Sequence, residues 1–213
     1  MIAFSGFSHV RRLLCLGAHS DDIEIGAGAT VLRAVRENPN IEVTWCVLSG
    51  NEVRQREARH GAEHILGPRV TKSVILGDFT DSNFPEQRHK IKQFFEQSLK
   101  SVDPDLILTH TRADAHQDHR MVNELTWNTF RAHQIWEYEI PKWDGDLMQP
   151  NLYVPVDPED VATKISVLRD VFASQRSKHW FDEETFRGLM RIRGLESNTR
   201  YSEAFFARKF VVG

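Results

Sequence analysis

Two short segments of the chain carry side chains that could bind a metal ion. Segment 19–22 (His-Ser-Asp-Asp) places one imidazole and two carboxylates directly after an apolar run. Segment 116–119 (His-Gln-Asp-His) adds two imidazoles and a further carboxylate much later in the chain. Ionisable groups at the end of a buried strand are costly unless something binds them. The two segments together therefore predict a hydrolytic zinc site.

A catalytic zinc site needs three protein ligands and keeps a fourth position open for water. His19 and Asp22 lie three residues apart in a turn that leads into a helix, so both can reach one ion, and a histidine of the second segment completes the set. Asp21 is then free to act as a general base. One of His116 and His119 is free to stabilise an oxyanion or to protonate a leaving group. Residue types alone leave open which histidine and which carboxylate, including that of the second segment, are ligands.

Strand and helix patterns alternate over the first two thirds of the chain. Apolar or β-branched runs predict strands at 12–17, 41–48, 71–76 and 106–109, and apolar stripes predict helices at 22–37, 54–66 and 87–102. This alternation is typical of a parallel sheet with right-handed crossovers, in which ligands bind outside the carboxyl ends of the strands. Both chemical segments fall there. We therefore expect an α/β domain with a mainly parallel sheet flanked by helices and a metal site at that edge.

The last third follows a different pattern. Residues 135–147 are aromatic and interrupted by proline and glycine, whereas 151–156 is typical of an edge strand, 162–175 of a helix and 202–212 of a terminal strand or turn. Neither a repeat nor a flexible linker marks a boundary, so we expect a single domain over 1–213. Its core, residues 1–130, would bind the metal, and residues 131–213 would shape the substrate site. The aromatic candidates for stacking against a sugar are Trp136, Tyr138, Trp143 and Trp180, although packing in the core explains each equally well.

Bulk composition excludes several classes of function. The 213 residues are 40 % apolar, which is enough for a core without disulfides, and both cysteines lie in apolar runs where reduced thiols are expected. A formal charge of −3 gives no attraction to nucleic acid or acidic membranes, and no apolar run is long enough to span a bilayer. We expect a cytoplasmic protein with no nucleic-acid partner and no membrane insertion. A dinucleotide site at 26–30 is disfavoured because the neighbouring carboxylates would repel a pyrophosphate.

The two chemical segments resemble the signature motifs of the PIG-L/LmbE-like zinc-dependent N-deacetylase family, which usually read Ala-His-Pro-Asp-Asp-Glu and His-Pro-Asp-His. Here Ser20 and Gln117 replace the prolines, and Ile23 stands where glutamate is common. The resemblance implies a single Rossmann-like α/β domain. It also implies a hydrolase that removes an N-acetyl group from an amino sugar, such as N-acetylglucosamine, or from an amino-sugar conjugate. Because family members often form oligomers, it hints at a homo-oligomer.

The same resemblance implies a role for each side chain. His19, Asp22 and His119 would be the zinc ligands, Asp21 the base, and His116 the group that polarises the tetrahedral intermediate. Iron(II) suits the same ligand set.

Substrate contacts are expected from three further residues. The helix at 54–66 is similar to the family's helix after its second strand, where an arginine near the metal often touches the substrate, so the resemblance implies Arg54. Tyr138 and Trp143 are the aromatic candidates for binding the small amino-sugar substrate.

Two other functions fit part of the pattern. His19 and Asp21 match half of the two-histidine, one-carboxylate triad of non-haem Fe(II) oxygenases, but those enzymes usually have all-β barrels. A zinc-containing carbohydrate-binding protein without turnover is the other alternative. The presence of both Asp21 and His116 gives no sign of lost activity.

Overall fold

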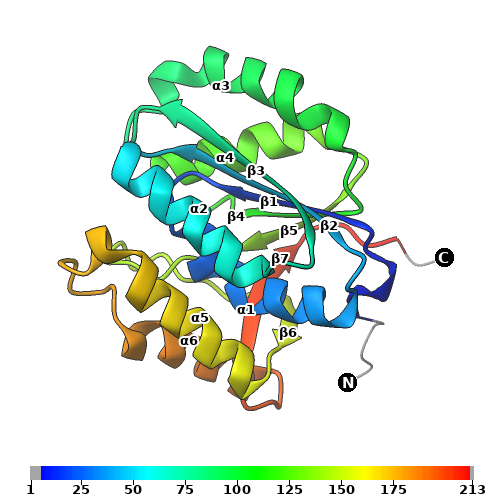
Figure 1. Ribbon diagram of the computed structural model, residues 1–213, viewed down its shortest axis with the longest axis vertical. Coiled ribbons are helices and arrows are strands. Elements are labelled where there is room, and N and C mark those ends of the chain that lie inside the picture. The colour runs from blue at the N-terminus through cyan, green and yellow to red at the C-terminus, as the bar shows by residue number, and fades with distance from the viewer. Residues whose placement is uncertain (1–5, 212–213) are drawn as a thin grey trace.

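A computed structural model describes residues 6–211, which fold around one seven-stranded sheet (Figure 1). The strands are β1 (Arg12–Gly17), β2 (Glu42–Ser49), β3 (Thr71–Phe79), β4 (Leu106–His110), β5 (Gln134–Tyr138), β6 (Leu152–Pro155) and β7 (Ser202–Ala207). Their order is β3-β2-β1-β4-β5-β7-β6. β1 to β5 run parallel, and β7 is antiparallel to both of its neighbours. The mainly parallel, Rossmann-like sheet is confirmed, and the last third of the chain joins the same sheet.

Helices cover both faces of the sheet (Figure 1). They are α1 (Asp22–Glu37), α2 (Glu52–Leu66), α3 (Arg88–Phe94), α4 (Gln117–Thr129), α5 (Pro158–Val171) and α6 (Glu183–Glu196). Alternate residues of each buried strand point to opposite faces. Leu13 of β1 therefore packs with the core under α1, α2, α5 and α6, and its neighbour Leu14 packs with the core under α3 and α4. A strand buried on both faces explains the continuous apolar run of β1.

Most of the predicted elements are confirmed to within a few residues. The strand predicted at 12–17 and the helix predicted at 22–37 have the bounds of β1 and α1, and β6 lies at the sheet edge as expected. The helix predicted at 162–175 starts earlier, at Pro158, because proline suits the first helical turn. The strand predicted to reach residue 212 ends at Ala207. Residues 212–213 lie outside the described part.

One predicted helix, 87–102, differs in its internal structure. α3 is followed by a π-helical turn at Phe95–Leu99 and a short 3-10 turn at Lys100–Val102. The buried residues Ile91, Phe95 and Leu99 are four positions apart. Residues four apart lie about one turn apart, so all three share one face and pack in the core under α3 and α4.

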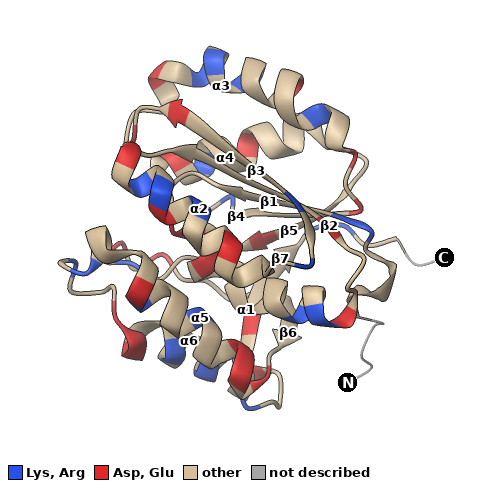
Figure 2. Cartoon of the chain, viewed as in Figure 1, with Lys and Arg blue, Asp and Glu red and all other residues tan. Residues whose placement is uncertain are grey.

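Other predictions about the bulk of the chain can be compared with the structure. Cys15 and Cys46 are free and buried, and burial raises the pKa of both thiols. Acidic and basic residues mix over the outer helices (Figure 2). Within residues 6–211 no helix combines the length and the apolar character needed to cross a membrane.

Candidate metal centre and active site

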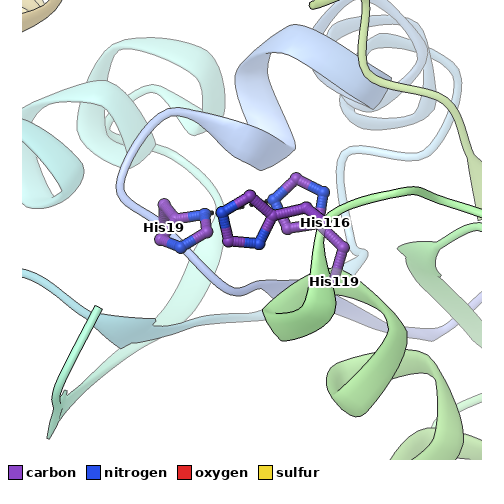
Figure 3. A group of neighbouring side chains, drawn as sticks. All are labelled: His19, His116 and His119. Atoms are coloured by element: carbon purple, nitrogen blue, oxygen red, sulfur yellow. Dashed lines mark hydrogen bonds between the residues drawn. The ribbon is translucent and has the colours of Figure 1, made fainter. Parts of the chain in front are cut away.

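The candidate site forms where two neighbouring parallel strands end. β1 ends at Gly17, and the tight turn that follows contains His19 and leads to Asp22, the first residue of α1. β4 ends at His110, and the following loop leads to α4. Because β1 and β4 pair directly, these two connections lie side by side. Figure 3 shows the imidazoles of His19, His116 and His119 converging from the turn after β1 and from the start of α4.

Three acceptor atoms form a small triangle at the centre of the site. His19 Nδ1 lies 3.1 Å from His119 Nε2 and 3.3 Å from Asp22 Oδ2. The third side, from His119 Nε2 to Asp22 Oδ2, measures 3.5 Å. Ligand atoms bound to a tetrahedral zinc ion at about 2.0–2.1 Å stand about 3.3–3.4 Å apart. The triangle therefore has the size that such an ion requires.

The opposite nitrogen of each histidine points to a carboxylate. His119 Nδ1 is 2.9 Å from Asp114 Oδ2, and His19 Nε2 is 3.1 Å from Asp81 Oδ1 and 3.4 Å from Asp118 Oδ2. A neutral imidazole that donates its proton outward keeps its lone pair on the inner nitrogen. With both rings neutral in these tautomers, two lone pairs and a carboxylate oxygen face one another, and a metal ion placed between them would bind all three.

The three groups of the triangle shift one another's pKa values. Burial raises the pKa of Asp22, but His119, His110 and His19 outweigh it and hold this pKa well below its ordinary value. Burial lowers the pKa of His19, but Asp22 and the outer carboxylates outweigh it and raise this pKa well above the ordinary value. Burial and then His110 lower the pKa of His119 to about 4. Without a metal, the positive charge beside Asp22 is thus a proton on His19, and a bound metal ion would have to replace that proton.

Asp21 adjoins the triangle without belonging to it. It is buried, and its Oδ1 accepts a hydrogen bond from Arg54 Nη2 at 2.7 Å. Arg54 also contacts Asp81, through Nη1 at 3.4 Å from Oδ2. Burial raises the pKa of Asp21, although the Arg54 charge opposes the shift. Arg54, predicted to touch the substrate, thus fixes two carboxylates of the site.

His116 has its two ring nitrogens in different surroundings. It caps the start of α4, because its Nδ1 accepts a hydrogen bond from the Asp118 backbone N–H at 3.2 Å. The proton of the neutral ring therefore resides on Nε2. Burial and then His19 lower the pKa of His116, so the ring is neutral near pH 7 and presents a hydrogen-bond donor.

His110 and Tyr138 lie beneath the site. His110 Nε2 is 3.2 Å from Asp22 Oδ2, but it already accepts the Ala18 N–H at 3.0 Å. Tyr138 is fully buried and donates its hydroxyl to Leu16 O at 2.6 Å. Such burial contradicts the expected substrate contact of Tyr138. Its aromatic ring supports His110 from below, with ring centroids 4.8 Å apart.

Sequence reasoning missed Asp81 altogether. This residue follows β3 at the same sheet edge, so the rule that locates sites at strand ends could have found it. The strand extends to Phe79 rather than to the expected residue 76, and this shift hid the position. Asp118, which was left open as a ligand, accepts the backbone N–H groups of Ser82 and Phe84 and so fastens the turn that carries Asp81.

Comparison with known proteins identifies the family. The family model described as PIG-L, GlcNAc-PI de-N-acetylase, matches residues 14–130, which include both chemical segments. The chain belongs to the PIG-L family. It is 29 % identical over 168 residues to the uncharacterized deacetylase YaiS of Escherichia coli (strain K12), a match that covers 74 % of this chain and 88 % of YaiS.

Solved structures share the fold at lower identity. N,N'-diacetylchitobiose deacetylase from Pyrococcus horikoshii superposes with a TM-score of 0.68 at 20 % identity, over 93 % of this chain and 84 % of that one. GalB, the 4-carboxy-2-hydroxymuconate hydratase of Pseudomonas putida KT2440, superposes with a TM-score of 0.73 at 16 % identity, over 95 % and 98 % of the two chains. Proteins named for different reactions thus share this fold.

Departures from the family motifs fall outside the acceptor triangle. Ile23, which stands where glutamate is common, is buried in the core. Glu24, one position later, is fully buried, and within the described residues neither of its carboxylate oxygens has a hydrogen-bond partner. Gln117 donates from Nε2 to Ser82 O at 2.5 Å. None of these changes removes an atom of the triangle.

The aromatic candidates are split between the core and the surface. Trp136 packs against Phe7 and Phe205, at the core that lies under α1, α2, α5 and α6. Trp143 is 65 % exposed and lies 6.3 Å from Trp180, measured between ring centroids.

Proposed function

We propose that the protein is a zinc-dependent N-deacetylase that hydrolyses the N-acetyl group of an amino sugar or amino-sugar conjugate. Family membership supports the reaction class, and the similarity to N,N'-diacetylchitobiose deacetylase supports an amino-sugar substrate. The observation that carries the proposal is the triangle of acceptor atoms, with the Asp21 carboxylate beside it.

His19, Asp22 and His119 are the residues we assign to the metal. They offer one inward acceptor atom each, and the separations of these atoms match a tetrahedral site. His110 is a weaker candidate because its Nε2 already accepts a backbone N–H. A bound zinc or iron(II) ion supplies Lewis acidity, which lowers the pKa of water and polarises an amide carbonyl.

The chain's own residues supply the proton transfers and charge stabilisation. Asp21 is the general base: it takes a proton from the attacking water, and its raised pKa suits that role. Arg54 holds Asp21 in place and keeps the carboxylate ionised before reaction. His116 presents Nε2–H to the oxyanion that forms from the carbonyl. Since His116 is neutral, the proton collected by Asp21 is the one delivered to the leaving amine.

The two alternatives are less favoured. An Fe(II) oxygenase was expected on an all-β barrel, whereas this chain forms a parallel α/β sheet and belongs to a deacetylase family. A sugar-binding protein without turnover would not need the buried Asp21–Arg54 pair, which costs desolvation energy to maintain.

Acetate release from a panel of N-acetylated amino sugars tests the proposal. Metal-stripped protein is reloaded with zinc or iron(II), and Asp21→Asn serves as the inactive variant. We expect metal-dependent release that falls by about 10²–10⁴-fold in the variant while one metal ion per chain is still bound. Release that Asp21→Asn leaves unchanged would refute the assigned base, and failure to bind any metal would refute the assigned centre.

A further inference from the structure

Two surface loops from the last third of the chain meet beside the catalytic centre. The loop after β5 is tied to the metal side: Lys142 Nζ lies 3.0 Å from Asp114 Oδ1, and the same carboxylate holds His119. The loop between α5 and α6 is tied to α2, because Ser174 donates its backbone N–H to Glu57 at 2.9 Å. Figure 1 shows this second loop on the side to which the parallel strands point.

Aromatic rings cluster where the two loops meet. Trp143 stacks on His179, with centroids 5.5 Å apart and an interplanar angle of 27°, and meets Trp180 edge-on. An indole that is 65 % exposed gains little from folding, yet this one is held in place by neighbouring rings. Exposed indole faces grouped in this way are suited to stacking against a ring of a ligand.

A cation completes the cluster. Lys178 Nζ lies over the ring of Trp180, 5.5 Å from its centroid. Within residues 6–211 no carboxylate forms a direct ion pair with Lys178. The Lys178 ammonium therefore lies at the aromatic cluster and is free to bind an anion.

We infer that Trp143, His179, Trp180 and Lys178 form a second subsite, which binds a ring that is linked to the acylated sugar and carries an acidic group. The indole of Trp143 stacks on that ring, and Lys178 pairs with its carboxylate or phosphate. This inference rests on the proposed function, because it assigns the part of the substrate beyond the acyl-bearing sugar. It makes an acidic glycoside a better substrate than a simple one.

Three glycosides of N-acetylglucosamine separate the contributions: methyl, phenyl and 4-carboxyphenyl. For the wild-type protein we expect kcat/KM for acetate release to rise about fivefold from the methyl to the phenyl glycoside. The 4-carboxyphenyl glycoside should give a further rise of about fivefold, and added salt should reduce this second rise. Dissociation constants measured calorimetrically on Asp21→Asn report the same preferences without turnover.

Variants assign each preference to its side chain. Trp143→Ala removes the preference for phenyl over methyl, whereas Lys178→Met removes only the preference for the carboxylate and Lys178→Arg retains it. Lys92→Met, on the exposed surface of α3, is the matched control and keeps both ratios.

The outcomes distinguish this inference from the proposed function. Acetate release with equal values for all three glycosides overturns the subsite and leaves the deacetylase. A Lys178→Met variant that keeps the carboxylate preference also overturns it. Binding preferences without any release support the subsite but refute the deacetylase, and no binding of any glycoside overturns both.

Discussion

Replacing Asp114 by asparagine should weaken metal binding although Asp114 itself is not assigned as a ligand. Its Oδ1 accepts the His116 backbone N–H at 2.8 Å and the Lys142 ammonium at 3.0 Å, so this position must remain an oxygen. An amide nitrogen would then replace Oδ2, 2.9 Å from His119 Nδ1. Two donors cannot face each other, so the His119 proton would move to Nε2 and remove the lone pair that the metal needs. Losing such an outer partner typically costs 10–100-fold in affinity, or about 1.4–2.8 kcal/mol.

Competition with a chelator of known zinc affinity measures this loss directly. Asp103→Asn is a matched control, because Asp103 is an exposed carboxylate that pairs with Arg12 away from the site. The metal-free proteins should have equal thermal midpoints if the effect is local. A zinc dissociation constant for Asp114→Asn within twofold of wild type would refute the assignment of the His119 proton, and with it the argument from the acceptor triangle.

Three further predictions concern the scaffold. Gly26→Ala should destabilise the fold by about 1–3 kcal/mol in urea unfolding, since a Cβ there would lie 2.2 Å from the buried tyrosine ring beneath the site; unchanged stability would mean that the ring moves freely. Lys164→Met should cost about 3–5 kcal/mol, because it strands the buried carboxylate of Glu203, which lies 2.6 Å from Nζ, and Lys164→Met combined with Glu203→Gln should recover part of this loss. Burial raises the pKa of Glu137, but Arg208 and other donors outweigh it and hold this pKa below its ordinary value. Its stabilising effect is therefore present above about pH 4.3 and lost as the pH falls through the lowered pKa, so the stability difference from Glu137→Gln should shrink on acidification.

The sequence predicts the centre of the molecule best where one physical rule dominates. β1 is apolar from Leu13 onward because it is buried on both faces. Ligands of parallel sheets bind at the carboxyl ends of the strands, and the turn after β1, which contains His19, lies at that end. Pairing of β1 with β4 then brings segment 116–119 to the same place. The convergence of segments 19–22 and 116–119 could therefore be predicted without coordinates, whereas the contact of Asp81 with His19 could not.

Elements whose polar residues find buried partners could not be predicted in the same way. β5 contains the charged residue Glu137, and Glu139 follows the strand directly. These two carboxylates interrupt the apolar run that is typical of an interior strand, so the sequence does not predict one here. Arg208 pairs with Glu137 at 2.7 Å, and Arg193 pairs with Glu139 at 2.7 Å. Both arginines lie far along the chain, so no local pattern reveals the pairing. The sequence likewise does not predict α4. Its N-terminal cap is His116, which the sequence indicates as a catalytic or metal-binding residue and not as a helix cap.

The outer carboxylates of the site connect catalysis to the loops that surround it. Asp114 holds His119 on one side and the loop after β5 on the other, through Lys142. Asp81 likewise contacts both His19 and Arg54. Both Asp114 and Asp81 are therefore shared between a proposed metal ligand and a residue of a segment that we propose to face the substrate. Loss of the Lys142 contact would free Asp114 to move away from His119, so changes in the loop after β5 should alter metal affinity as well as KM. A loop variant that changed KM but not metal affinity would show that the substrate-facing loops and the metal ligands are independent.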